Sequence, residues 1–363
     1  MNKDIVDVAS KPLSEKIFFG EFGHYLRIDN IQHDVAKKLK EQSEGNTWFA
    51  KEVPFDRDRI HFSNLPEDAQ RAFKLNICYQ TLMDSGVDNG YMTILKKIVT
   101  SSIWSMLYGR IGIEEQIHAE SYSYGLIEMF GQKASETLDL VYTDDFIKTR
   151  MQNEIEVFNS VQKIVLDEGR SDDEAKKAVL KMLMGIYLLE SVKFPYSFLV
   201  TFTINRAYNN AIQGMTRLIR LIAHDELNIH VPTNKNVLNI LRRDEQEGFS
   251  HLFDWFDKEA LAITETIVQQ EIEWSKYLLD DRDVIGLNTD ISEHFIKYRA
   301  MIALRDIGIK SPYNEQKSDI IDWFNDYRDI SKQNAALQEA TNISYQKSVL
   351  KNDLENFDKE TSL

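Results

Sequence analysis

The spacing of apolar positions predicts a chain built almost entirely from helices. Leu, Ile, Lys, Glu, Asp and Gln recur at helical spacing, whereas runs of β-branched residues are scarce. Long helices joined by short loops favour one elongated bundle over two separate folds, so the fold class we expect is all-α. The helices that the pattern predicts cover about 31–43, 66–98, 101–130, 143–168, 171–207, 209–243, 249–280 and 290–308, with a short helix or docked segment at 318–327.

Breaks in this pattern divide the chain further. A bend is expected at Gly86 or Gly90, and a distortion at Pro232. The first 30 residues look like an irregular arm, and 52–66 like an extended connection. The end of the chain is polar and weakly periodic. We therefore expect a helical domain with its arm over 1–330 and a flexible tail over 331–363.

Composition supports a large soluble domain. Of the 363 residues 43% are hydrophobic, enough for an extensive core. The formal net charge of −15 argues against binding to nucleic acid or to an anionic membrane. Cys78 is the single cysteine, so no intramolecular disulfide can form. No signal-peptide core and no membrane span of roughly 18 residues is apparent in the sequence. These features predict a cytoplasmic protein.

The stretch GIEEQIHAESYSYG (112–125) places polar side chains on the buried face of a predicted helix. Glu115, His118 and Tyr122 share one stripe of that helix. A lone Glu-x-x-His is common by chance, and its ordinary interpretation is a solvated charged face. However, Asp84 and Glu190 also lie within apolar helical stretches, where a buried carboxylate needs a partner.

The acidic positions form a repeated pattern. Asp84 is followed 31 residues later by the Glu115–His118 pair, and Glu190 is followed 36 residues later by Glu226, which pairs with a histidine. Four helices supplying four carboxylates and two imidazoles match the ligands of a ferritin-like di-metal site. Oxygen and imidazole donors without thiolate favour iron or manganese over structural zinc. The six candidate ligands are Asp84, Glu115, His118, Glu190, Glu226 and His230.

Tyr122 lies one helical turn beyond His118 and is within reach of such a site. Phe194, Phe198 and Ile222 stand at helical spacing from candidate ligands and could screen the phenol from water. On spacing alone, an ordinary core tyrosine is the better interpretation.

Several ordered motifs show a resemblance that covers nearly the whole chain. They are WFAKEVPFDRDRI, YQTLMDS, EEQIHAESY, LESVKFPYSF, RLIAHDE and WSKYLL. Together they closely resemble the small, radical-generating subunit of class I ribonucleotide reductase. The resemblance implies a ferritin-like bundle, usually a homodimer. It also implies two Fe ions per chain, activated by O2 and oxo-bridged when oxidised, beside a stable tyrosyl radical. Mn could replace Fe, with a flavoprotein activator, and the sequence does not decide between the two metals.

The resemblance also assigns roles to individual residues. It makes the six candidate positions the metal ligands and Tyr122 the radical-bearing tyrosine. It assigns long-range electron transfer to Trp48, Asp225, Tyr345 and Glu339. Asp225 is placed to accept a hydrogen bond from the non-metal nitrogen of a ligand histidine. From the residues alone, Trp48 would be a packing residue and Tyr345 a random aromatic of the tail.

One position departs from the family pattern. The family typically reads DE-x-x-H at its last ligand helix, whereas this chain reads DELNIH, with one extra residue before His230. A π-bulge could absorb that insertion. His224 is the nearby alternative, although it points elsewhere on a regular helix, and it stands where relatives often have arginine. Pro195 also lies inside an expected helix.

A reductase of this type needs a second protein. The chain has no nucleotide-binding motif and a single cysteine, so it cannot reduce nucleotides alone. The resemblance implies that the radical passes to a catalytic large subunit, which converts ribonucleoside diphosphates or triphosphates to deoxyribonucleotides. Apolar residues punctuate the acidic tail and could dock in a groove of that partner, although an unstructured terminus would look the same. They are Val349, Leu350, Leu354, Phe357 and Leu363.

Two other functions remain open at this point. A di-metal oxidase or hydroxylase of the same fold would act on a small apolar substrate and would need an open cavity beside the metals. An iron-storage or purely structural bundle would have no use for Trp48 or Tyr345.

Overall fold

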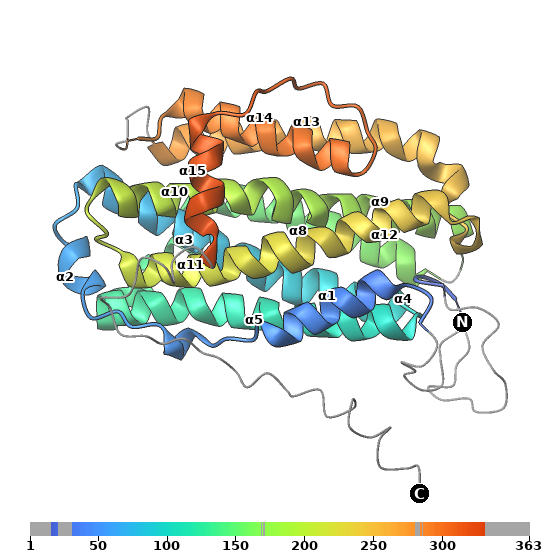
Figure 1. Ribbon diagram of the computed structural model, residues 1–363, viewed down its shortest axis with the longest axis horizontal. Coiled ribbons are helices and arrows are strands. Elements are labelled where there is room, and N and C mark those ends of the chain that lie inside the picture. The colour runs from blue at the N-terminus through green and yellow to red at the C-terminus, as the bar shows by residue number, and fades with distance from the viewer. Residues whose placement is uncertain are drawn as a thin grey trace, which may run out of the picture.

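The structure is a computed structural model in which residues 16–20, 31–167, 169, 171–279, 284 and 286–330 are described. Within these residues the chain is helical and forms no strand, apart from two isolated bridges, Phe18 with Val99 and Val284 with Leu287. Figure 1 shows an elongated bundle whose long helices run along its long axis. The all-α prediction is confirmed. Most of the predicted arm, and the whole predicted tail from 331, lie outside the described residues.

The long helices follow the predicted ranges closely. Their ends are set by local chemistry, as at Ser171, whose side chain and that of Glu174 form a reciprocal capping box. The long and medium helices are α1 (Asp34–Gly45), α3 (Glu67–Gly86), α4 (Thr93–Ile98), α5 (Ser102–Phe130), α8 (Asp145–Leu166), α9 (Asp172–Leu188), α10 (Phe194–Ala207), α11 (Gln213–Asp225), α12 (Val231–Arg243), α13 (Phe253–Leu279), α14 (Thr289–Asp306) and α15 (Asp319–Arg328).

The pattern missed several short elements. The expected extended connection at 52–66 contains α2 (Asp58–Phe62), so that prediction was wrong in part. The Asp58 carboxylate accepts hydrogen bonds from the backbone N–H groups of Gly214 and Met215, at 2.9 and 3.0 Å, which ties this turn to the start of α11. Contacts of this kind join residues far apart in sequence, so periodicity cannot reveal them. Two more short helices, α6 (Ala134–Leu138) and α7 (Leu140–Thr143), follow α5.

Three of the predicted long helices contain a wide, π-helical turn. These turns are η2 (Val87–Met92), η4 (Leu189–Lys193) and η5 (Glu226–His230). The first lies where the bend at Gly86 or Gly90 was expected. After the other two, Pro195 and Pro232 stand in the first turn of the next helical segment. A proline lacks the backbone N–H that a π turn leaves poorly paired, so it is tolerated there.

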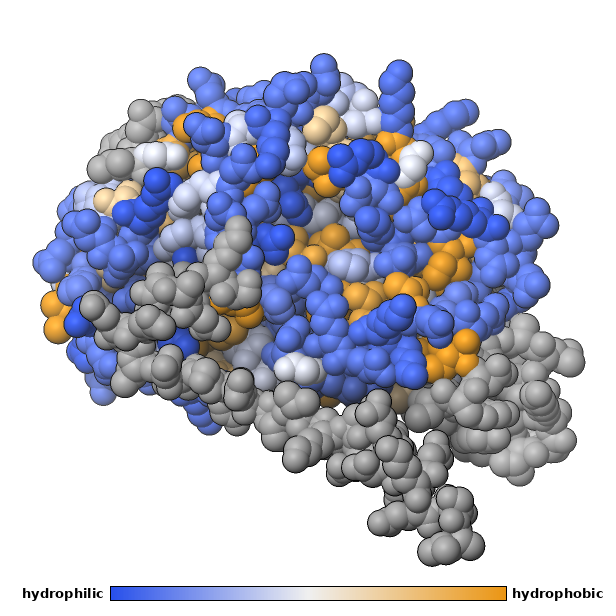
Figure 2. Space-filling model, in the orientation of Figure 1, coloured by the Kyte–Doolittle hydropathy of each residue, from blue (hydrophilic) through white to orange (hydrophobic). Residues whose placement is uncertain are grey.

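The core of the bundle lies between the helices that carry the candidate ligands. α5 packs against α3 and α11, α10 packs against α3 and α11, and η4 packs against η5. α13 and α14 form an outer pair along one side, and α15 crosses the bundle (Figure 1). Hydrophilic side chains cover most of the face shown in Figure 2, with apolar patches scattered between them.

One helical run reaches the composition of a membrane span, which the sequence did not lead us to expect. The run Asp172–Ala207 is long and apolar enough by that measure, but 94% of the relevant window is buried inside the protein. Such burial is what a core helix of a bundle shows.

Candidate metal centre

Four helical regions bring the six predicted ligands together at the middle of the bundle. α3 contributes Asp84 near its end, and α5 contributes Glu115 and His118 from one face. The π turn η4 contributes Glu190, and the π turn η5 contributes Glu226 and His230. All six side chains are fully buried.

The six residues form two overlapping groups. Asp84, Glu115, His118 and Glu226 offer ligand atoms within 4.8 Å of one another, and so do Glu115, Glu190, Glu226 and His230. Glu115 and Glu226 belong to both groups, as bridging carboxylates would. Nδ1 of His118 lies 3.1 Å from Glu226 Oε1, and Nδ1 of His230 lies 3.0 Å from Glu226 Oε2 and 3.2 Å from Glu115 Oε1. The geometry is that of two adjacent metal positions.

The atoms that face this centre make no hydrogen bond of good geometry, although several of them lie close together. Buried polar atoms are normally paired, because each unpaired one costs free energy. The unpaired atoms are both oxygens of Asp84, Glu115 and Glu226, Oε1 of Glu190, and Nδ1 of His118 and His230. Such a cluster of buried, inward-facing donors fits two hard divalent cations, since oxygen and imidazole ligands suit Fe or Mn.

The charges at the centre also favour a cation. Burial raises the pKa of Asp84 and of Glu190 well above the ordinary carboxyl value, and neighbouring carboxylates add to this increase. For Glu226 burial acts in the same direction, but the two imidazoles outweigh it and lower its pKa to about 2. Four buried carboxyl groups packed this closely repel one another when they are ionised, and divalent cations would remove that repulsion.

Tyr122 is fully buried beside this centre. Burial raises the pKa of its phenol, and the nearby Asp84 carboxylate raises it further, so the side chain is neutral at physiological pH. Its hydroxyl makes no hydrogen bond of good geometry. The residues expected to screen it, Phe194, Phe198 and Ile222, are all fully buried, and the two phenylalanine rings stack with centroids 5.9 Å apart.

A comparison with protein families decides what kind of protein carries this centre. The family model "Ribonucleotide reductase, small chain" matches residues 26–320, which is most of the chain. The chain belongs to the ribonucleotide reductase small-chain family. The resemblance seen in the sequence is thereby confirmed.

Relatives and solved structures agree with this family assignment. The chain is 29% identical to ribonucleoside-diphosphate reductase subunit beta of Buchnera aphidicola subsp. Schizaphis graminum. It is 28% identical to ribonucleoside-diphosphate reductase 1 subunit beta of Escherichia coli O157:H7, and both alignments cover 92% of each chain. The R2 subunit from Clostridium botulinum superposes with a TM-score of 0.81 at 21% identity, covering 91% of this chain and 99% of that one. The dimanganese(II) NrdF of Streptococcus sanguinis superposes with a TM-score of 0.64 at 17% identity, covering 83% and 98%. The small-chain fold is therefore shared across this family.

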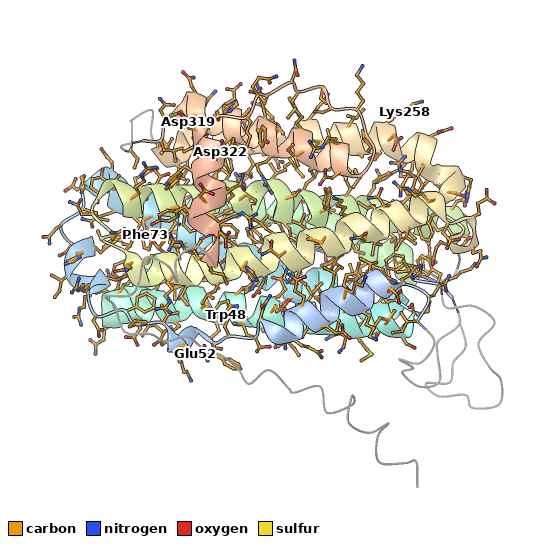
Figure 3. The ribbon with its side chains drawn as sticks, in the orientation of Figure 1. Trp48, Glu52, Phe73, Lys258, Asp319 and Asp322 are labelled. Atoms are coloured by element: carbon orange, nitrogen blue, oxygen red, sulfur yellow. The ribbon has the colours of Figure 1, made fainter. Side chains whose placement is uncertain are left out.

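In each of the two candidate ligand histidines, His118 and His230, the ring nitrogen that points away from the metal position, Nε2, faces a carboxylate. Nε2 of His118 lies 3.2 Å from Oδ2 of Asp225, as expected from the sequence. The indole N–H of Trp48 donates to the same Asp225 oxygen at 2.7 Å, and the Trp48 and His118 rings lie nearly parallel. Figure 3 labels Trp48 on the segment that follows α1. A carboxylate at Nε2 favours the tautomer whose Nδ1 lone pair points at the metal position.

The partner of the second histidine is a residue that the sequence analysis missed. Nε2 of His230 lies 3.0 Å from Oε2 of Glu114, and Ser43 donates to the other Glu114 oxygen at 2.5 Å. Arg110 lies on the same side, with Nε 3.8 Å from Glu114 Oε1. The signal in the sequence was the pair of adjacent acids, Glu114 and Glu115. Neighbouring residues on a helix point in different directions, so if Glu115 faces the metal position, Glu114 must face another group.

His224 does not compete with His230. Its Nε2 lies 3.0 Å from the Asn46 amide and its Nδ1 lies 2.9 Å from the Asn228 amide, so both ring nitrogens already have partners. The π turn η5 absorbs the extra residue between Glu226 and His230 and leaves both side chains facing the centre. Two other predicted residues, Glu339 and Tyr345, lie outside the described residues.

A third cluster of potential ligands lies elsewhere, at His33, Asp244 and Glu247. The indole N–H of Trp104 donates to Nδ1 of His33 at 3.0 Å, which occupies the lone pair of that nitrogen. The neutral ring must then carry its proton on Nε2 and has no free lone pair for a metal. This cluster is consequently a poor metal site.

Neither of two surface hollows of the protein reaches the metal centre. One lies between α8, α9 and α13 beside Trp255, and the other lies between α10, α14 and α15 beside Trp323. An oxidase or hydroxylase acting on a small apolar substrate would need an opening at the buried carboxylates, and these two hollows do not provide it.

Proposed function

We propose that this small chain binds two metal ions at the six clustered residues and uses them to oxidise Tyr122 to a stable radical. The radical then serves a separate catalytic large subunit, which reduces ribonucleoside diphosphates to deoxyribonucleotides. The observation that carries the proposal is the set of unpaired, fully buried ligand atoms around Glu115 and Glu226, one helical turn from a buried tyrosine. Relatives named ribonucleoside-diphosphate reductase subunit beta support the diphosphate as substrate.

Iron is the metal we propose, and manganese is the alternative. Two ferrous ions bound among these ligands would supply, with O2, the oxidising power that a phenol requires. Asp84, Glu115, His118 and Glu226 would hold one ion, and Glu115, Glu190, Glu226 and His230 the other. The same donors accept Mn(II), and a structural relative carries two Mn(II) ions.

The surroundings of Tyr122 suit its oxidation. Oxidising a neutral tyrosine to its radical removes one electron and one proton, so a base must stand beside the hydroxyl. The Asp84 carboxylate lies close enough to raise the phenol pKa and is the available proton acceptor. Complete burial keeps water and reductants away from the radical.

The chain Trp48–Asp225–His118 leads from the metal centre toward the side of the bundle that carries α1. We propose that it carries an electron inward during activation, with Trp48 as the donor, and the radical equivalent outward during turnover. Tyr345 and Glu339 would continue this route in the tail, which would dock on the large subunit. We further propose that the active form is a cytoplasmic homodimer.

The test is to load the metal-free protein anaerobically with Fe(II), admit O2, and record an EPR spectrum. We expect a tyrosyl signal that Tyr122→Phe abolishes while the variant still binds iron. A matched control is Tyr187→Phe, because Tyr187 is also buried but donates to the backbone carbonyl of Ala303.

The outcome against the proposal is equally clear. If iron binds and is oxidised without a tyrosyl signal, the experiment is repeated with Mn(II) and a reduced flavoprotein. Failure under both conditions would overturn radical generation and would favour a di-metal oxidase.

A further inference from the structure

The carboxylate of Glu190 is held by a series of hydrogen bonds whose other members, Asn234 and Tyr91, lie outside the motifs quoted from the sequence. Asn234 donates from Nδ2 to Oε2 of Glu190 at 2.8 Å. Tyr91 donates from its hydroxyl to Oδ1 of the same Asn234 at 2.7 Å. Beyond it, the Tyr108 ring lies edge-on to that of Tyr91, with centroids 6.3 Å apart. The series therefore runs from Glu190 away from the metal centre and into the core.

Chemistry fixes the direction of every bond in this series. An ionised carboxylate can only accept, so the Asn234 amide must present its NH2 group to Glu190. Its carbonyl oxygen then faces Tyr91, and the phenol must donate. Turning the amide over would place its carbonyl oxygen against the Glu190 carboxylate and lose that bond. The arrangement holds the second oxygen of Glu190, Oε1, toward the metal position.

The residues of this hydrogen-bonded series are buried. Tyr91 is 0% and Asn234 is 1% exposed, so water does not replace either partner. Two wide turns bring these residues together, because Tyr91 lies in η2 and Asn234 lies one turn after η5. Losing one member would leave a buried polar group unpaired.

The hydrogen bonds from Glu190 through Asn234 to Tyr91 differ in kind from the contacts that hold the two histidines. A histidine ligand needs an acceptor on its outer nitrogen, and Asp225 and Glu114 supply one. A carboxylate ligand needs a donor, and an amide is the neutral side chain that both donates to Glu190 and accepts from Tyr91. A carboxylate in place of Asn234 would repel Glu190.

We infer that Asn234 is a positioning residue that fixes the Glu190 carboxylate for metal binding, and that Tyr91 in turn fixes the Asn234 amide. The inference rests on the metal binding of the proposed function but not on radical formation.

The positioning role is tested by titrating the metal-free full chain with Mn(II) under anaerobic conditions and measuring free Mn(II) by EPR. We expect Asn234→Leu to weaken binding by about tenfold to hundredfold, the usual cost of losing a residue that orients a ligand. The control is Asn76→Leu, since Asn76 is equally buried but bonds Ser197 and Thr201 away from the centre. The control should bind Mn(II) as the wild-type chain does.

A gentler variant guards against misfolding. Tyr91→Phe keeps the ring and removes only the phenol donor, so its affinity for Mn(II) should fall by less than that of Asn234→Leu. Tyr187→Phe is its matched control and should show no loss. Wild-type affinity in both Asn234→Leu and Tyr91→Phe would overturn the positioning role. Because this titration uses no O2, its result does not depend on radical formation.

The same titration separates this inference from the proposed function. Absence of Mn(II) binding by the wild-type chain would count against the proposed function itself, whereas wild-type binding that the Asn234 and Tyr91 variants retain would count only against the positioning role.

Discussion

The two halves of the candidate metal centre use the same ligand types but have different surroundings. On the side of Asp84 and His118, the outer contacts run through Asp225 to Trp48, and a phenol lies beside a carboxylate. On the side of Glu190 and His230, the outer contacts run to Glu114, Asn234 and Tyr91, which are packed in the core. The first half therefore has groups that can move electrons and protons, while the second has groups that hold ligands still. Equal ligands do not imply equal roles.

Removing a shared ligand should give the largest effect. Glu226 belongs to both groups, so Glu226→Ala should abolish tight binding at both positions, whereas Glu190→Ala should abolish it at one. Anaerobic Mn(II) titration gives the stoichiometry directly. Equal loss in the two variants would show that the halves do not form separate positions.

The outer carboxylates should separate metal binding from electron transfer. Asp225→Asn and Glu114→Gln each remove the charge that orients one histidine, so each should weaken metal binding by about tenfold to hundredfold. Only Asp225→Asn also interrupts the connection to Trp48. At saturating metal, we expect nucleotide reduction with the large subunit to be lost in Asp225→Asn and largely retained in Glu114→Gln. Equal activity in the two variants would remove the functional difference between the halves.

The metal-free centre should be a source of instability. The Asp84 carboxylate is buried without a hydrogen bond of good geometry, so Asp84→Asn should stabilise the metal-free protein by about 1–3 kcal/mol. Urea denaturation measures this difference. With Mn(II) present the order should reverse, because the wild-type chain gains binding free energy that the variant loses. A less stable metal-free variant would show that another group already compensates the Asp84 charge.

A buried acid outside the centre should give the smallest effect and serves as a reference. Burial raises the pKa of Glu247 to about 7, with Asp244 adding to the increase, while the Ile17 N–H and Lys16 oppose it. The unfolded chain ionises near the ordinary glutamate value, so Glu247 contributes stability at low pH that is lost as the pH rises toward 7.

Glu247→Gln removes this loss and keeps an oxygen that can accept from Ile17. Its stability relative to the wild-type chain should therefore increase between pH 5 and pH 8, by roughly 1–3 kcal/mol. Thermal unfolding at both pH values measures the change. A difference that stays constant with pH would contradict the raised pKa.

The sequence predicted the long helices from the spacing of their apolar residues. It predicted the candidate ligands because a charged residue within an apolar helical stretch stands out in that pattern. A carboxylate such as Glu190 within an apolar helix has few explanations other than a cation. The structure places all six candidates together, although their role as ligands stays a prediction. The contacts of Glu114 and Asn234 could not be predicted, since they depend on side-chain direction and on pairs such as Tyr91 and Asn234, which are 143 residues apart.

The short helices could not be predicted either, because they too depend on contacts between residues far apart in the sequence. The helix α2 is stabilised by the bonds that Asp58 makes to the start of α11, and no local pattern encodes them. The position of the long helices, in contrast, depends on residues a few places apart, which is the distance over which periodicity is informative.

The π turn at Glu226–His230 has a consequence for how such proteins are recognised. A helix that widens by one residue keeps both flanking segments in place, so an insertion inside a ligand motif need not disturb the site. A search that demands a fixed spacing between the acid and the histidine would reject this chain, although both side chains reach the same place. In this bundle, the site depends on where the two side chains lie in space and not on the number of residues between them.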